Sequence, residues 1–414
     1  MGKKTTKARV ALVCDWLTTV GGAEQVLKAI HELYPSAPIY TSQYSEKGID
    51  WFKDADVRTG WLQIFPKGLR RFLGPLRQLY FSHLDLSDYD LIISVTGAEA
   101  KSVKKGTATH ICYCHVPTQY YWQFYDKYLE NPGFGFLDPL ARLGLKLFVK
   151  PLRRADYQAA QRPDYFVTIS SYASAEIKKA YKRESSVIYP PVNISEFHKV
   201  VENYITKKGK SQASQKANKT IENSKSQIAK AEQISPQNTI KSNNFKYYIN
   251  YSRQVTWKRL DLIVKSCLAT NSPLCLIGDG PEHNNLVKLA GGSPLITFLP
   301  AMPQDELVKY LQNSKAFIFP SMEPFGIAPV EALAAGVPVI AYKGGGALDY
   351  IKDEKNGLFF DRQTVKSLSE SFKKFEHTSL ATPDKISQSV ENFSVATFKS
   401  DLAKFIKEKI ADDR

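Results

Sequence analysis

The 414-residue sequence predicts an α/β protein with two doubly wound parallel sheets. Its length corresponds to about two domains at roughly 150 residues each. Short apolar runs alternate with amphipathic stretches of helix length, which is the pattern of parallel strands joined by crossover helices. A 43% share of hydrophobic residues is enough for a buried core in each domain.

In the first half of the chain, apolar runs precede turns and helix signals. Residues 9–14 form such a run, Gly21 and Gly22 form a turn, and an amphipathic stretch follows at 23–34. Ser170 and Ser171 are good N-cap residues for a further helix. Three more apolar runs, at residues 91–95, 110–114 and 165–169, have the composition of buried parallel strands.

In the second half the alternation is regular, and it predicts five strands separated by helices. A short helix is expected after Gly346. The strands are predicted at residues 246–251, 274–277, 295–299, 316–319 and 337–341, and the helices at 258–269, 281–290, 304–313 and 329–335.

These patterns divide the chain into an N-terminal domain at residues 1–198, a C-terminal domain at 245–395, and a final helix at 396–414 packing back toward the N-terminal domain. Residues 199–244 contain nine Lys and three Glu, and no aromatic residue lies between Tyr204 and Phe245. Such a segment buries too little apolar surface to offset the entropy of ordering it, which predicts a disordered basic linker or insertion. Two sheets joined in this way predict a ligand-binding cleft between the domains.

The composition also bears on compartment and partners. No run of 18 apolar residues exists, and five cysteines lie inside apolar runs, so we expect a cytoplasmic protein with reduced thiols. The net charge of +15 is partly concentrated in residues 199–244, and a solvated tether is favoured over nucleic-acid binding there. Residues 62–77 and 143–154 mix large apolar side chains with Lys and Arg, a pattern typical of basic helices packed on a core or of a surface on the anionic inner face of a membrane.

The segment Glu323-Pro-Phe-Gly-Ile-Ala-Pro-Val-Glu331 carries the strongest chemical signal. It follows a buried strand, and Pro329 suits the first position of the next helix, so free amides near residues 326–328 form an anion site. Glu323 and Glu331 lie on either side of that site and suit hydrogen bonds from vicinal sugar hydroxyls. The alternative is that Glu331 only complements the helix dipole and Glu323 is a solvated loop residue.

Two cations follow an earlier strand of the same half. Arg253 and Lys258 are placed to reach a diphosphate at the carboxyl edge of the sheet, although each also reads as an ordinary surface charge. No Asp-x-Asp motif lies beside these residues, so we expect neither a metal nor another cofactor. The corner Ile277-Gly-Asp-Gly-Pro-Glu282 has glycines that permit a close backbone approach.

Together these motifs resemble the retaining glycosyltransferases of family 4, which have the two-domain GT-B architecture. The resemblance is carried by Glu323 to Glu331, Ser252-Arg253 with Lys258 to Asp261, Gly278 to Glu282, Gly336 to Val339, and Asn356-Gly-Leu358. It implies that Glu323 binds hydroxyls of the donor sugar and acts at the reaction centre, that Glu331 binds the ribose, and that Arg253 and Lys258 bind the diphosphate. It also implies that the backbone following the strand seats sugar and phosphate, through Phe325, Gly326, Ile327 and Ala328.

In the N-terminal half, the segment from Cys112 to Trp122 resembles the family's His-x-Pro segment. This implies that His115 faces the donor sugar as a catalytic residue, and that Gly21 and Gly22 lie near the donor phosphates. Read without the resemblance, His110, Cys112, Cys114 and His115 are candidate metal ligands, but 112 and 114 share one strand face while 115 points away. A plain core histidine at 115 is the other interpretation.

The predicted activity is transfer of a hexose, with mannose favoured, from a nucleoside diphosphate sugar such as GDP-mannose to a hydroxyl of a glycan or lipid-linked glycan. The resemblance leans toward mannosyltransferases of surface-polysaccharide assembly. Ser252, Asp349 and Gln119 depart from common family residues and blur the choice of donor and acceptor. The alternatives are a GT-B sugar-nucleotide epimerase and a non-catalytic basic nucleic-acid-binding protein.

Overall fold

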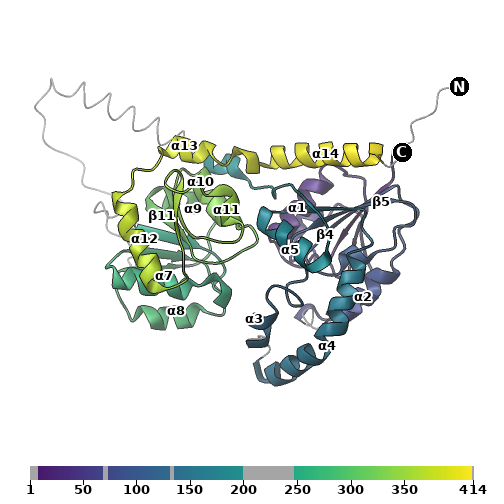
Figure 1. The fold of residues 1–414 in the computed structure, drawn as a ribbon, viewed down its shortest axis with the longest axis horizontal. Coiled ribbons are helices and arrows are strands. Elements are labelled where there is room, and N and C mark those ends of the chain that lie inside the picture. Colours follow the sequence, from purple (N-terminus) through teal and green to yellow (C-terminus); the bar gives the residue numbers. More distant parts are fainter. Residues whose placement is uncertain (1–7, 69–72, 131–134, 199–246, 413–414) are drawn as a thin grey trace, which may run out of the picture. The chain divides into compact units, whose positions relative to one another are not determined.

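The computed structural model describes residues 8–68, 73–130, 135–198 and 247–412 (Figure 1). The predicted linker at 199–244 lies outside the described residues. The chain forms two compact units: unit 1 comprises Met1–Pro191 and Val395–Arg414, and unit 2 comprises Val192–Ser394. Each unit contains one parallel sheet, which confirms the predicted α/β class.

The sheet of unit 1 has seven strands in the order β3-β2-β1-β4-β5-β6-β7, and all neighbouring strands pair in parallel. The central strands β1, β4 and β5 are almost wholly buried, as their continuous apolar sequences require. The strands are β1 (Val10–Cys14), β2 (Ile39–Thr41), β3 (Val57–Thr59), β4 (Leu91–Thr96), β5 (Thr109–Cys114), β6 (Tyr165–Thr168) and β7 (Ser186–Val187).

Helices cover both faces of this sheet. Alternate strand residues point to opposite sides, so the continuous apolar runs of β4 and β5 place apolar side chains on both faces. Cys112 and Cys114 pack with Tyr181 of α5, whereas Tyr113 between them contacts Phe398 of α14. The helix α14 also contacts α1 through an ion pair between Lys399 and Glu32. The helices are α1 (Gly22–His31), α2 (Gly74–His83), α3 (Tyr125–Glu130), α4 (Asp138–Ala159), α5 (Ser171–Tyr181) and α14 (Val395–Asp412), and the 3-10 turns are η1 (Asp50–Phe52), η2 (Trp61–Ile64), η4 (Ala100–Ser102) and η5 (Gly135–Leu137).

The sheet of unit 2 has six parallel strands in the order β10-β9-β8-β11-β12-β13. The chain moves outward from β8 to β10 and then returns to β11, so β8 and β11 are neighbours at the point where the strand order reverses. Ligands of doubly wound sheets bind outside the carboxyl ends of strands at such a point. The strands are β8 (Tyr247–Tyr251), β9 (Leu274–Ile277), β10 (Ile296–Leu299), β11 (Ser314–Phe319), β12 (Val339–Tyr342) and β13 (Gly357–Phe360).

Figure 1 shows α7, α8 and α12 on one face of this sheet and α9, α10 and α11 on the other. The first group packs with the strands in one apolar cluster that contains Tyr248 stacked on Phe372. The helices are α7 (Leu260–Ala269), α8 (His283–Ala290), α9 (Gln304–Gln312), α10 (Ile327–Ala334), α11 (Ala347–Tyr350), α12 (Val365–His377) and α13 (Pro383–Gln388), with 3-10 turns η7 (Thr256–Lys258) and η8 (Glu391–Phe393).

Two local predictions need correction. Lys258 was expected to begin a helix, but it ends the turn η7, and α7 begins only after Arg259, which has a left-handed φ of 54°. Pro329 was expected at the first position of its helix and is the third residue of α10. A proline fits there for the same physical reason, since none of the first four amides of a helix has an intrahelical acceptor.

Candidate active site

The carboxyl end of β11 leads into the amino terminus of α10 through a sharp turn at Gly326. This residue has a φ of 95°, and a Cβ there would lie 2.6 Å from Phe319 Cζ, so only glycine fits. No side chain among the described residues caps α10, and its first amides at Ile327 and Ala328 therefore remain open toward a ligand. The helix dipole adds partial positive charge at this position.

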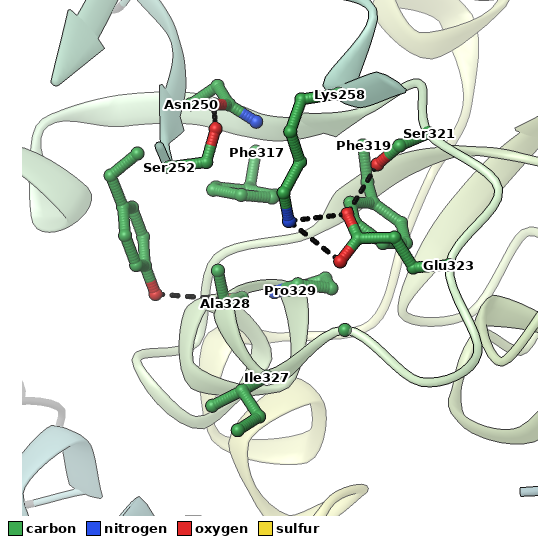
Figure 2. A pocket seen from close by; sticks show the side chains of 12 residues that line it. Asn250, Ser252, Lys258, Phe317, Phe319, Ser321, Glu323, Ile327, Ala328 and Pro329 are labelled. Carbon is green, nitrogen blue, oxygen red and sulfur yellow. Dashed lines mark hydrogen bonds and ion pairs between the residues drawn. The ribbon is translucent and has the colours of Figure 1, made fainter. Parts of the chain in front are cut away.

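Lys258 and Glu323 meet directly in front of that helix end (Figure 2). Lys258 Nζ donates to both carboxylate oxygens of Glu323, at 2.6 and 2.7 Å. Ser321 Oγ donates to Glu323 Oε1 at 2.6 Å. The two charged side chains are 23% and 18% exposed, so water reaches the pair and a ligand can compete for either partner.

Glu331, one turn into α10, is held by a tyrosine of β8. Tyr251 OH lies 2.8 Å from Glu331 Oε2 and 2.9 Å from the carbonyl oxygen of Ala328. Burial raises the pKa of Glu331, and the hydrogen bond from Tyr251 opposes that rise because it favours the ionised carboxylate. Glu331 is thus a partly buried carboxylate held in one orientation.

The glycine loop before α11 supports the backbone of Glu323 and Phe325. Gly345 has a φ of 66°, and a Cβ there would lie 2.3 Å from the carbonyl oxygen of Glu323, while the amide of Gly346 donates to the same oxygen at 2.8 Å. The ring of Phe325 is only 3% exposed and packs against Tyr350. A ligand at this corner therefore meets the backbone beside Phe325 and not its side chain.

Arg253 lies on the loop after β8, exposed, and makes no hydrogen bond or ion pair with any residue that the structure describes. The loop itself is fixed, because Gln254 exchanges hydrogen bonds with the turn after β9: its amide donates to the Asp279 carbonyl at 2.9 Å and its Nε2 to the Gly278 carbonyl at 2.8 Å. A Cβ at Gly278 would lie 2.4 Å from the Ser252 carbonyl oxygen. The guanidinium is thus free to move on a rigid support.

A pocket of about 250 Å³, including space open to solvent, lies at this corner. Small-molecule sites usually occupy about 300–1,000 Å³, so this pocket suits one part of a larger ligand. Arg253, Phe325 and Glu331 do not line it, although they lie on the same elements. The lining residues are Asn250, Tyr251, Ser252, Lys258, Phe317, Phe319, Ser321, Glu323, Gly326, Ile327, Ala328 and Pro329.

In unit 1, His115 follows β5 and is held without a charge. Burial lowers the pKa of His115 to about 4, against a smaller opposing effect of Asp15, so the imidazole is neutral at pH 7. Its Nε2 is buried and has no hydrogen-bond partner among the described residues. A buried nitrogen of this kind is a candidate contact for a ligand.

Gly21 and Gly22 lie at the carboxyl edge of the same sheet, where Gly21 is the N-cap of α1 and Gly22 its first residue. A Cβ at Gly21 would lie 2.9 Å from Glu24 Oε2, so a side chain there would have to displace that carboxylate. Within the part of the chain that the structure describes, no side chain caps α1, which leaves its first amides open as at α10.

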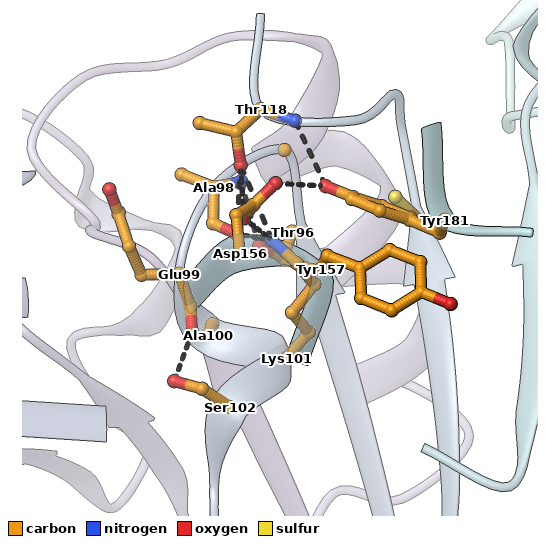
Figure 3. A network of polar contacts seen from close by, with 12 residues as sticks. Thr96, Ala98, Glu99, Ala100, Lys101, Ser102, Thr118, Asp156, Tyr157 and Tyr181 are labelled. Carbon is orange, nitrogen blue, oxygen red and sulfur yellow. Dashed lines mark hydrogen bonds and ion pairs between the residues drawn. The ribbon is translucent and has the colours of Figure 1, made fainter. Parts of the chain in front are cut away.

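A buried polar network fixes the segment that follows His115 (Figure 3). Asp156 of α4 accepts from Lys101 Nζ at 2.6 Å, from Thr118 Oγ1 at 2.8 Å, from Trp122 Nε1 at 2.7 Å and from Tyr181 OH at 2.8 Å. Lys101 and Asp156 are each 1% exposed. The buried carboxylate is compensated by these four donors, one of which is the positively charged Lys101.

Sequence reasoning missed Tyr251, Ser321 and the Asp156 network. Tyr251 ends a strand two residues before Arg253, and a hydroxyl at the carboxyl end of a strand was a usable signal. Lys101 and Asp156 carried no comparable signal, because 55 residues separate them. Among the described residues, no three His, Cys, Asp or Glu side chains are grouped to hold a metal ion.

Residues 231–393 match the family model for glycosyl transferases group 1. The α-1,3/1,6-mannosyltransferase alg2 of Schizosaccharomyces pombe is 23% identical over 380 residues, covering 86% of this chain and 71% of that protein. The α-1,3/1,6-mannosyltransferase ALG2 of Dictyostelium discoideum is 26% identical over 338 residues, covering 74% and 70%. The chain is a glycosyltransferase.

Solved structures establish the fold of this glycosyltransferase. HepE of Anabaena, in complex with UDP, superposes with a TM-score of 0.63 at 16% identity, covering 97% of this chain and all of that one. WaaG, a glycosyltransferase involved in lipopolysaccharide biosynthesis, gives a TM-score of 0.60 at 14% identity, covering 96% and 99%. The glycosyltransferase therefore has the GT-B fold that the motifs predicted.

Proposed function

We propose that this glycosyltransferase, as a member of family 4, transfers a hexose, with mannose favoured, from a nucleoside diphosphate sugar to a hydroxyl of a glycan or lipid-linked glycan. The observation that carries the proposal is the meeting of Lys258, Glu323 and the open amino terminus of α10 at the point where the strand order reverses. The two mannosyltransferase relatives favour mannose. A Mycobacterium tuberculosis relative described as GDP-mannose-dependent, 34% identical over 109 residues, favours a guanosine donor.

The chemistry follows from charge development at the leaving group. Lys258, Arg253 and the amides of Ile327 and Ala328 hold the diphosphate and stabilise it as it departs, each well-placed donor contributing about 3 kcal/mol to the transition state. Two cations and a helix dipole supply the positive charge that a metal ion supplies elsewhere, so the reaction proceeds without a metal. Glu323 orients the sugar.

The remaining groups complete the donor contacts in this proposal. Glu331 accepts hydrogen bonds from the ribose hydroxyls, and the neutral His115 contacts a hydroxyl of the donor sugar through Nε2. The acceptor attacks on the face from which the diphosphate leaves, so the anomeric configuration is retained without a covalent intermediate. The amino-terminal turn at Gly21 and Gly22 adds amides near the phosphates.

A donor panel tests the proposal. The protein is incubated with GDP-mannose, UDP-glucose and related donors in EDTA, with and without a glycan acceptor. Glu323→Ala and Lys258→Ala should each lower turnover at least about 100-fold. Lys315→Ala is the matched control. Lys315 lies in β11, the strand that precedes Glu323, and forms an ion pair with Glu376 at 2.7 Å, but neither residue lines the pocket. Unchanged rates in both site variants would refute the assignment, and acceptor-independent release of free sugar would favour an epimerase.

We propose further that α4 places the enzyme on the anionic inner face of a cell membrane. Leu140, Leu143, Leu147 and Phe148 are 54–67% exposed, and Val149 on the other side of the helix is buried. The apolar side chains of the first half of α4 therefore face away from the core, contrary to the interpretation of a core-packed helix with a basic outer face. The exposed cations of α4 are Arg142, Lys146, Lys150 and Arg154.

The structure contains no helix, within its described residues, of the length and apolar character needed to cross a bilayer. Binding through α4 would instead combine partial insertion of leucines with attraction of lysines and arginines to anionic lipid, about 1 kcal/mol per cation. The five buried free thiols fit a cytoplasmic location.

Vesicle flotation tests this placement. The wild type should bind vesicles that contain phosphatidylglycerol at physiological salt and not vesicles of phosphatidylcholine alone. The double variant Leu143→Ser with Leu147→Ser should bind at least about tenfold more weakly, because two large apolar side chains are lost. Val287→Ser, at an exposed residue of α8, should bind like the wild type. Equal binding by all three proteins would reject α4 as the docking element.

A further inference from the structure

The two charged groups assigned to the donor, Lys258 and Glu323, pair with each other in this structure. Lys258 Nζ contacts both oxygens of Glu323 at 2.6 and 2.7 Å, and Ser321 adds a third donor at 2.6 Å. Each charge therefore compensates the other. Among the described residues, a ligand that takes Lys258 removes two of the three hydrogen bonds that the Glu323 carboxylate receives.

We infer that this ion pair is a specificity element that makes the site discriminate an intact nucleoside diphosphate sugar from a free nucleoside diphosphate. The inference rests on the proposed function. An intact donor supplies phosphate oxygens to Lys258 and sugar hydroxyls to Glu323, so both partners of the broken pair are satisfied again. A free nucleoside diphosphate supplies only the first, and it leaves a carboxylate with one remaining donor beside a new anion.

The surroundings of Glu323 leave it no substitute for Lys258. Its backbone is fixed by the amide of Gly346 on its carbonyl oxygen and by the close approach of Gly345. Ser321 Oγ is the only other side-chain donor that contacts its carboxylate among the described residues. Ser321 is therefore a positioning residue, which keeps Oε1 oriented when Lys258 turns to the diphosphate.

The Lys258–Glu323 ion pair also affects the release of the product. After transfer, the sugar leaves with the acceptor and the nucleoside diphosphate remains. Glu323 then regains Lys258 only if the diphosphate gives it up. The ion pair thus competes with the product and favours its release, while it competes less with an incoming donor.

Calorimetric titration tests the inference with GDP and GDP-mannose, and with UDP and UDP-glucose, in the absence of acceptor. Glu323→Gln removes the negative charge that holds Lys258, so it should bind the free diphosphate at least about tenfold more tightly than the wild type. Glu323→Ala, which also frees Lys258, should show the same gain and serves if the glutamine variant does not fold. The ratio of the dissociation constant of the free diphosphate to that of the intact donor should fall at least about tenfold in both.

Matched variants isolate the cause. Lys258→Met combined with Glu323→Gln should lose the gain, because no lysine remains to be released. Glu376→Gln removes the acid of the Lys315 pair outside the pocket and should leave nucleotide affinity unchanged. If both Glu323 variants bind the free diphosphate no more tightly than the wild type, the inference is wrong. The proposed function still stands in that case, provided that the wild type turns over a donor. A wild type that binds none of the four nucleotides would overturn both.

Discussion

Removing the hydroxyl of Tyr251 tests the role of Glu331 without touching a charged residue. Tyr251→Phe deletes the donor that lies 2.8 Å from Glu331 Oε2 and leaves the ring in place. A hydrogen bond to a charged group contributes about 1.5–3 kcal/mol. Because about 1.4 kcal/mol corresponds to a factor of ten, donor kcat/KM should fall about 10- to 100-fold if Glu331 holds the ribose.

The pH profile separates this role from general destabilisation. Burial already raises the pKa of Glu331, and the tyrosine hydrogen bond opposes the rise, so its loss should raise that pKa further. The ionised carboxylate is the form that accepts ribose hydroxyls. The acid limb of kcat/KM should therefore move to higher pH in Tyr251→Phe, with activity lost earlier as the pH falls.

The assay is initial-rate turnover of the donor between pH 5 and pH 8. Tyr247→Phe is the matched control, because Tyr247 lies on the same strand and its hydroxyl donates to the Tyr310 carbonyl at 2.9 Å, outside the pocket. Both variants lose one tyrosine hydroxyl, and both should show similar thermal stability. If their kcat/KM values and acid limbs coincide, Tyr251 does not act through Glu331 and the reasoning is wrong.

Three further predictions concern the glycine loop before α11, the His115 imidazole and the Asp156 network. Gly345→Ala combines an unfavourable φ with a clash against the Glu323 backbone, so it should lower both the melting temperature and donor turnover. Gly291 has a similar φ of 59° with open space around it, so Gly291→Ala should cost only about 1 kcal/mol of stability. The His115 imidazole should titrate near pH 4 by NMR, and since a lowered pKa favours the neutral form, it should stay uncharged from pH 5 upward; a midpoint near 6.5 would contradict its burial. Asp156→Asn should lower the free energy of unfolding of unit 1 by about 3–5 kcal/mol. Glu184→Gln, in an exposed ion pair, should change that free energy by less than about 1 kcal/mol. Equal effects of the two variants in denaturant melts would reject the network as a fixed element.

The sequence predicted most of the strands that are buried apolar runs. Residues 9–14 and 110–114 form β1 and β5 within one residue of the prediction, and Ser170 caps α5 by accepting the Ala173 amide at 3.0 Å. The strands β2, β3, β7 and β13 were not predicted. The strands β2, β3 and β7 have only two or three residues, which is too short for alternation or an apolar run to be recognised. β13 has four residues, as many as the predicted β9, so its length does not explain why it was missed.

The residue types of the site were apparent from local motifs, but their contacts were not. Lys258 and Glu323 were placed at one sheet edge because both follow parallel strands, yet nothing local indicated that they pair with each other. Sixty-five residues separate them, and their meeting depends on two loop paths that are set by the glycines at 278 and 345. The burial of the Phe325 ring likewise depends on Tyr350, which lies 25 residues later in the chain, in the four-residue helix α11.

A crystal structure of the wild type with GDP-mannose, or another donor that it turns over, shows whether the donor binds at the corner between β8, β11 and α10. We expect a diphosphate oxygen within about 2.7–3.2 Å of the Ile327 or Ala328 amide, Lys258 turned from Glu323 to the phosphates, and a sugar hydroxyl on the Glu323 carboxylate. A donor bound elsewhere, with the Lys258–Glu323 pair intact, would contradict it.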